Sequence, residues 1–156
     1  MPHRIKIKLL SLAFFVALGV AVAGALPQWP VMAASAVSKE SSAIRHLVVL
    51  KDAKLKFKAT TGKGHFGTMS ELKEENLIDA ELAGGFKDGY CFVLQTTDAE
   101  FEVTAVPARY PSDGRRSFYF SLEDAIIRAA DKEGRAADAN DPPLPEAERV
   151  AASTPN

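Results

Sequence analysis

Residues 41–61 have the hydrophobic periodicity of one long helix. Apolar side chains recur there at steps of three, four and seven, which place them along one face of a helix with 3.6 residues per turn. The main stripe is Ile44, Leu47, Val48 and Leu55, with a neighbouring ridge of Leu50, Lys54 and Phe57. We expect Ser41 or Ser42 to cap the start and Gly62 to end the helix. A helix with one apolar stripe is marginal in water by itself, so it needs a partner surface.

The second half of the chain alternates apolar and polar positions with a period of two. Residues 90–96 and 100–106 show this most clearly, residues 116–121 predict a third strand, and residues 126–128 predict a short fourth. Because the links between them are short, we expect an antiparallel meander. The long helix is the only element large enough to cover one face of this sheet. The pattern therefore predicts an α+β fold, with one long N-terminal helix packed on a three- or four-stranded antiparallel sheet.

Two further segments complete the pattern. Residues 68–76 are expected to form a short acidic helix with Ser70 as its N-cap, before Gly84 and Gly85 interrupt the chain. Residues 132–156 are rich in alanine, charge and proline and have almost no bulky apolar side chain. That composition predicts a disordered polar tail.

The first residues have the pattern of an export signal. Basic residues precede an uncharged apolar run at residues 9–26, and small residues follow it. A run of this length is also at the lower end of what spans a bilayer. Two alternatives stay open: a cleaved signal peptide, or an apolar anchor helix with the N-terminus in the cytoplasm. The expected organisation is a signal or anchor at residues 1–36, a domain at 39–131 and the tail at 132–156.

Composition and charge are those of an ordinary globular protein. The chain has 156 residues, a net charge of −1 and 25% charged residues, which argues against a dedicated nucleic-acid binder. Lysines gather in the second half of the predicted helix, but aromatic residues are not interleaved with them as in a stacking site. We interpret them as a solvated helix face. The acidic residues of 68–82 are a complement to these lysines, either in the same chain or in a neighbour.

No catalytic, cofactor-binding or metal-binding residue is predicted. The single cysteine, Cys91, is expected to be buried and inert because it lies in the hydrophobic run YCFVL. His46 and His65 lack the spacing of a metal site, and Ser70, His65 and Glu71 are better explained by helix capping than by catalysis. Four acidic or amide residues near the C-terminus do not match the spacing of an EF-hand calcium loop; they are Asp131, Asp138, Asn140 and Asp141. We therefore predict that the protein is not an enzyme.

Short motifs in a fixed order resemble a known family. They are TTGKGHFG, SEL, NLIDAEL, KDGYCFVL, FEVTAVPARY, GRRSFYFS and IIRAAD, within residues 41–131. This order resembles the globular part of type IV pilin-like (prepilin-type, pseudopilin-like) proteins, in which a helical spine carries an antiparallel sheet. The N-terminus departs from that family, whose mature chains have a glutamate at position five. The residues five places on from Gly19 and Gly24 are Gly24 and Trp29.

The resemblance implies an exported, non-enzymatic pilin-like domain with a structural or protein-interaction role at the cell envelope. Its expected partner is a protein there, either a second copy or a pilus or type II secretion-like component. Membrane contact is expected only through residues 9–26, and no nucleic acid or cofactor is expected. The expected location is periplasmic or extracellular, or anchored in the inner membrane. The alternative is a periplasmic ligand-binding or adaptor module that uses the outer face or an edge strand of the sheet.

Overall fold

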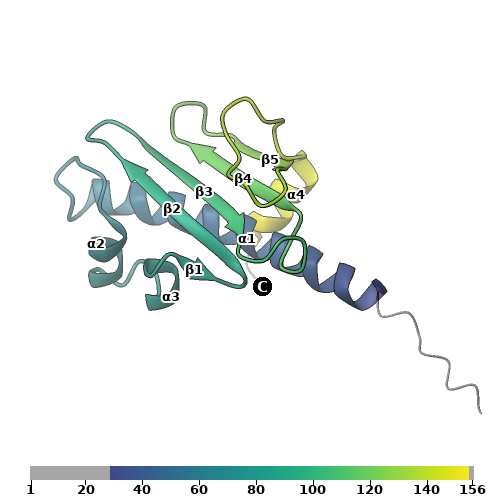
Figure 1. The fold of residues 1–156 in the computed structure, drawn as a ribbon. Coiled ribbons are helices and arrows are strands. Elements are labelled where there is room, and N and C mark those ends of the chain that lie inside the picture. The colour runs from purple at the N-terminus through teal and green to yellow at the C-terminus, as the bar shows by residue number, and fades with distance from the viewer. Residues whose placement is uncertain (1–28, 155–156) are drawn as a thin grey trace, which may run out of the picture.

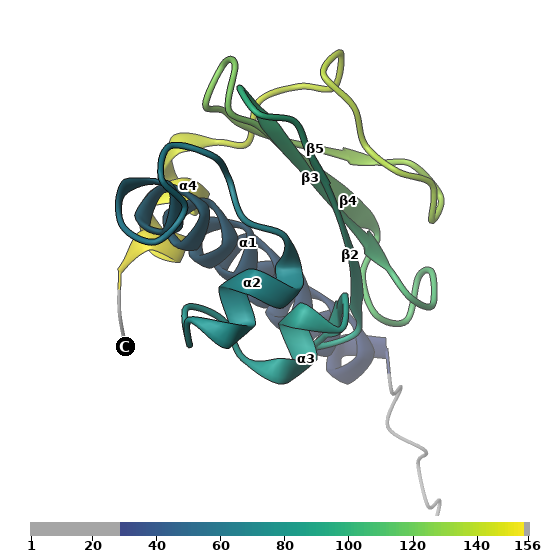
Figure 2. The same cartoon turned by 90° about the vertical axis from the view of Figure 1, so that its left-hand side faces the viewer.

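One long helix lies across one face of a five-stranded antiparallel sheet (Figures 1 and 2). A computed structural model of the chain describes residues 29–154. The helix is α1 (Trp29–Ala59), and each strand pairs with the next along the chain. The strands are β1 (Phe86–Lys87), β2 (Tyr90–Thr96), β3 (Phe101–Pro107), β4 (Arg116–Ser121) and β5 (Ile127–Asp131). The α+β class and the antiparallel meander are confirmed.

The strand number is a correction, since the sequence predicted three or four strands. The additional strand, β1, has only two residues and is too short to show a period of two. Its register is set by β2, with Phe86 opposite Cys91 and Lys87 opposite Tyr90.

Helix α1 begins earlier than predicted. Its described part starts at Trp29, twelve residues before the expected cap at Ser41. The Ser41 hydroxyl donates to the Val37 carbonyl one turn back, so it lies inside the helix and caps nothing. The helix ends after Ala59, close to the predicted end, and the Gly62 N–H donates to the Phe57 carbonyl.

The core lies between α1 and the inner face of the sheet. Residues on α1 at helical spacing are buried against inward side chains of β2, β3 and β4; they are Ala43, Ile44, Leu47, Leu50, Ala53 and Phe57. Leu55 is 41% exposed, so its place on the predicted buried stripe is wrong. Ile44 and Leu47 of that stripe are buried, and further along the helix the ridge through Leu50, Lys54 and Phe57 faces the sheet, because the period of 3.6 rotates the stripe along a helix of this length.

Two short helices connect α1 to the sheet: α2 (Met69–Glu74) and α3 (Ala80–Ala83). The N-cap of α2 is Thr68, not Ser70 as predicted. The Thr68 hydroxyl accepts from the Glu71 N–H while the Glu71 carboxylate accepts from the Thr68 N–H, which is a capping box. Asp79 caps α3 by accepting from the Leu82 N–H.

The C-terminal segment differs from the predicted disordered tail over its described residues, 132–154. Leu144 is 1% exposed in the core, and its N–H donates to the Ile127 carbonyl of β5. A final helix, α4 (Glu146–Ser153), packs beside α1. The prediction from composition failed because the segment, although poor in apolar residues, is ordered by the buried Leu144 and by hydrogen bonds to the free edge of β5.

No helix within residues 29–154 is both long enough and apolar enough to cross a membrane. The predicted signal or anchor at residues 9–26 lies outside the described residues. Of the predicted N-terminal segment 1–36, residues 29–36 form the first turns of α1.

Candidate functional site

A lysine is completely buried beneath the sheet. The exposed fraction of Lys54 is 0%, and its ammonium group donates to the Gly67 carbonyl and, at 2.6 Å, to the Thr96 hydroxyl. The same nitrogen lies 5.2 Å from the centre of the Phe101 ring. Burial lowers the Lys54 pKa from 10.5 to about 8, although the charge of Glu71 acts to raise it. Lys54 thus joins α1 to the connector before α2 and to the end of β2.

A buried glutamate joins α1 to the start of β4. Glu40 is 7% exposed and accepts from the backbone N–H groups of Arg115 and Arg116, at 2.8 Å and 3.2 Å. The Arg116 guanidinium donates to Glu40 and also to Glu148 of α4, at 2.8 Å each. This network, Glu40–Arg116–Glu148, connects three elements that are far apart in the sequence.

A second buried carboxylate lies next to it. Asp113 is 1% exposed and accepts from Lys39 on α1 at 2.7 Å and from Arg109 at 3.0 Å. The hydrogen bond from Arg109, followed by that from Lys39, lowers the pKa of this carboxyl despite its burial. A Cβ on the neighbouring Gly114 would collide with the hydroxyl of Tyr90, so the glycine of the GRR motif permits this close approach. We call the two buried carboxylates with Lys39, Arg109 and Arg116 the helix clamp.

Helix α1 continues beyond the helix clamp, and residues 34–38 there are not buried. From residue 34 onward, the first buried position on the helix is Glu40, whereas Val37 is 61% exposed and Ala34, Ser35 and Ser38 are also exposed. Figure 1 shows this end of α1 extending past the sheet. The clamp therefore lies at the point where the helix leaves the rest of the domain.

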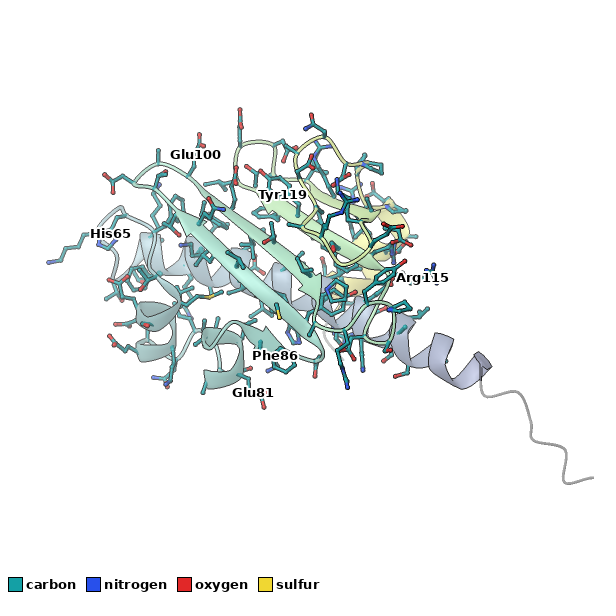
Figure 3. All side chains as sticks on the ribbon, in the orientation of Figure 1. His65, Glu81, Phe86, Glu100, Arg115 and Tyr119 are labelled. Carbon is teal, nitrogen blue, oxygen red and sulfur yellow. The ribbon has the colours of Figure 1, made fainter. Side chains whose placement is uncertain are left out.

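The outer face of the sheet is uncovered over β1 to β3. Its cross-strand rows are Phe86–Cys91–Val106 and Val93–Thr104. We call these five residues the open face. Phe86 is 52% and Val93 53% exposed. Figure 3 views the sheet from the side opposite α1 and shows Phe86 at the β1 edge.

The prediction that Cys91 is buried is wrong, since the cysteine is exposed on this open face. Tyr90 and Phe92 point to the core, and period-two alternation sends the residue between them outward. The hydrophobic run YCFVL suggested that Cys91 is buried, but at this point only one face of the sheet is covered.

The other half of the outer face, over β4 and β5, is covered by the chain itself. Ser117 is buried and its hydroxyl donates at 2.6 Å to the Arg135 carbonyl, while Tyr119 is 6% exposed. Ala137, in the same covering segment, is 2% exposed. The open face is thus the part of the sheet surface that residues 132–144 do not reach.

The residues considered for catalysis or metal binding lie in structural contacts. His46 is 2.8 Å from Asp88 and packs edge-on to Phe92, whereas His65 is exposed beside Phe57. Ser70 is exposed. The Glu71 carboxylate caps α2, and the backbone hydrogen bond from Thr68 lowers its pKa.

The C-terminal acids are held by basic side chains. Asp138 and Asp141 both accept from Lys132, and Asp131 accepts from Arg115. Among the described residues, no group of three or more His, Cys, Asp or Glu side chains could hold a metal ion.

The predicted complementary charges form no direct ion pair within the described part of the chain. No lysine of residues 51–63 pairs with an acid of residues 68–82, although the charge of Glu71 acts to raise the pKa of Lys54. Lys51 instead pairs with Asp52, and Asp79 with Lys87.

The helix clamp was not predicted from the sequence, although one signal for it existed. Glu40 lies three and four residues before Ala43 and Ile44, which is the spacing of the buried stripe. Asp113 gave no such signal, because its loop has no periodic pattern of apolar residues.

Comparison of the chain with protein-family models, with curated proteins and with solved structures finds no match.

Proposed function

We propose that this protein is a non-enzymatic, pilin-like domain with a structural or protein-interaction role at the cell envelope. The observation that carries the proposal is α1: thirty-one helical residues are described, and within residues 34–59 the buried positions run only from Glu40 to Phe57. Such a helix is suited to presenting the sheet at a distance from whatever holds its N-terminal end.

The helix clamp supports the same role. Glu40 of α1 accepts from the backbone N–H of Arg115 in the loop before β4, and Asp113 of that loop accepts from Lys39 of α1 and from Arg109. Buried, geometrically specific ion pairs of this kind restrict orientation more than they add stability. A domain that holds a surface in a fixed orientation relative to its helix needs that restriction.

The proposal is tested by the intact mass and location of the protein in fractionated cells. Envelope-associated protein, either of full length or shortened within residues 1–36, is expected. Recovery of the full-length chain in the cytoplasm would overturn the proposal.

A second candidate, an envelope adaptor, is favoured by the open face. Exposed aromatic and aliphatic side chains on one surface are typical of interaction sites. The same fractionation separates the two: soluble, shortened protein favours the adaptor, and full-length protein in the membrane fraction favours presentation by the helix.

A further inference from the structure

The C-terminal helix α4 lies on α1 with a mostly charged side inward. The helix packs beside α1, as Figure 2 shows, yet none of its own residues is buried. Its three half-buried residues are Glu148, Arg149 and Ala152, whose spacing places them on one face of a helix. Val150, the one bulky apolar residue of α4, is 57% exposed. The contact face of α4 therefore contributes little apolar surface.

The surface beneath α4 is apolar. Its lining residues from α1, from β4 and from β5 are Ile44, Leu47, Val48, Phe120 and Ile127, which we call the α4 groove. All five belong to the hydrophobic core or pack against it. Displacement of α4 would expose a continuous apolar groove.

Helix α4 fills this groove incompletely. A hollow of about 220 Å³ lies between Ile44 and Ala152, and another of about 120 Å³ lies between Leu47 and Arg149. Protein interiors are normally close-packed, with few voids larger than a water molecule. The Nε of Arg149 is also buried without a hydrogen-bond partner, which costs free energy. Hollows and an unpaired polar atom make α4 a weak occupant.

One polar contact holds α4 in place. Within residues 34–154, the only side-chain hydrogen bonds from α4 to an earlier element join Glu148 to the Arg116 guanidinium, the shorter at 2.8 Å. The N-cap of α4 is Pro145, which makes no side-chain capping bond. A helix of eight residues is marginal by itself in water, so α4 depends on the groove for its helical structure.

The residue before this helix is fixed much more firmly. Leu144 is 1% exposed, and its N–H donates to the Ile127 carbonyl. Residues 145–154 can therefore leave the groove while Leu144 stays in the core.

We infer that α4 is a displaceable strap, and that the α4 groove takes an amphipathic helix of a partner protein in its place. The partner helix has a carboxylate at the position of Glu148, which binds Arg116. It has bulky apolar side chains at the positions of Arg149 and Ala152, which fill the two hollows. Helix α4 itself shows that a helix fits the groove, and its faults define a better occupant. The inference goes beyond the proposed role and does not depend on cellular location.

Hydrogen exchange of the purified full chain tests whether the strap opens. The amides of α4 are expected to exchange at least about tenfold faster than the amides of Leu144 and Ala129, because the strap opens without unfolding the domain. Equal protection of α4 and Leu144 would overturn the inference.

A charge reversal tests the polar contact. Glu148→Lys should accelerate exchange in α4 at least about threefold further and leave the Leu144 amide unchanged, which also shows that the variant folds. Glu146→Lys is the matched control, since the Glu146 side chain is 82% exposed and contacts only Arg149 of the same helix. Equal acceleration by the two variants would contradict a strap held by Arg116.

A peptide supplied in trans tests the groove. The probe is a fluorescent peptide of residues 145–154 that carries Arg149→Leu and Ala152→Leu. Fluorescence anisotropy should show saturable binding to the full-length Glu148→Lys chain, at least about tenfold tighter than to the wild-type chain, where the strap competes.

The control peptide has the same charge and the same number of leucines, placed on the outward face: Ala147→Leu, Val150→Leu and Arg149→Ala. It should bind the Glu148→Lys chain at least about tenfold more weakly than the first peptide. Absence of saturable binding, or equal binding of the two peptides, would overturn the inference. Failure of fractionation alone affects only the proposed role.

Discussion

Lys54 binds its proton less tightly in the folded chain than in the unfolded chain. Its ammonium group is removed from water and has two neutral acceptors, Gly67 and Thr96, in place of a carboxylate partner. The folded-state pKa of about 8 lies below the unfolded value of 10.5. Between these values the unfolded chain holds more protons, so the free energy of unfolding rises with pH there.

This predicts a pH dependence that belongs to one residue. Between pH 7 and pH 10, Lys54 should add about 2 kcal/mol to the free energy of unfolding. In Lys54→Met this gain should be absent, so the wild-type value minus the variant value rises with pH in denaturant titrations. Burial raises the pKa of Tyr90, which opposes this gain at high pH. Because Tyr90 is present in both proteins, its effect cancels when the variant value is subtracted from the wild-type value.

Lys56→Met is the control, because Lys56 is exposed on the same helix two residues away. This variant keeps Lys54, so its free energy of unfolding should still show the rise with pH that Lys54 contributes. A pH-independent difference for Lys54→Met would mean that the buried ammonium keeps its ordinary pKa.

At the scale of elements, the helix clamp decides how α1 meets the sheet. Glu40→Ala should lower the free energy of unfolding by about 3 kcal/mol, because the N–H groups of residues 115 and 116 and the Arg116 guanidinium lose the buried carboxylate that accepts from them. Urea denaturation measures this loss. Ser41→Ala, at the exposed neighbouring position, should change stability by less than about 0.5 kcal/mol. Similar values for the two variants would contradict a structural role of Glu40.

Leu144 decides whether the C-terminal segment stays on the domain. Leu144→Ala should cost about 3 kcal/mol, as expected for a buried leucine. Hydrogen exchange should then accelerate at the Ala129 and Leu144 amides, which bond across the edge of β5.

Leu55→Ala is the comparison for Leu144→Ala, since Leu55 is 41% exposed and should cost less than about 1 kcal/mol. A loss for Leu144→Ala no larger than that would agree with a disordered tail.

Helices and strands could be predicted from the sequence where apolar residues recur with a regular period. The prediction failed where a segment is ordered by residues far away in the chain. The alternation in β2 and β3 was sufficient to identify both strands. The same alternation, followed strictly, also places Cys91 outside. The order of residues 132–154 depends on the free edge of β5, and the burial of Asp113 depends on Lys39, 74 residues away. Neither dependence leaves a local pattern.

At the scale of the whole molecule, α1 has a free part and a packed part. None of residues 34–38 is buried, whereas Glu40 is buried and bonded to the loop before β4. Because proteolysis requires local opening, elastase should cut after the small residues of 34–38 before any other site in residues 34–144. Mass spectrometry should find a stable fragment that begins before Glu40. Earlier cleavage between residues 43 and 57 would contradict this division of the helix.

The order of the strands also has a consequence for synthesis. Every strand pairs with its neighbour in the chain, but Glu40 must wait for Arg115 and Arg116, which are 75 and 76 residues further on. At 5–20 residues per second, that delay is about 4–15 s. For most of that time, the apolar ridge of α1 has left the ribosome while β4 has not. The nascent chain is therefore a natural client for a chaperone that holds an exposed apolar helix until the sheet arrives.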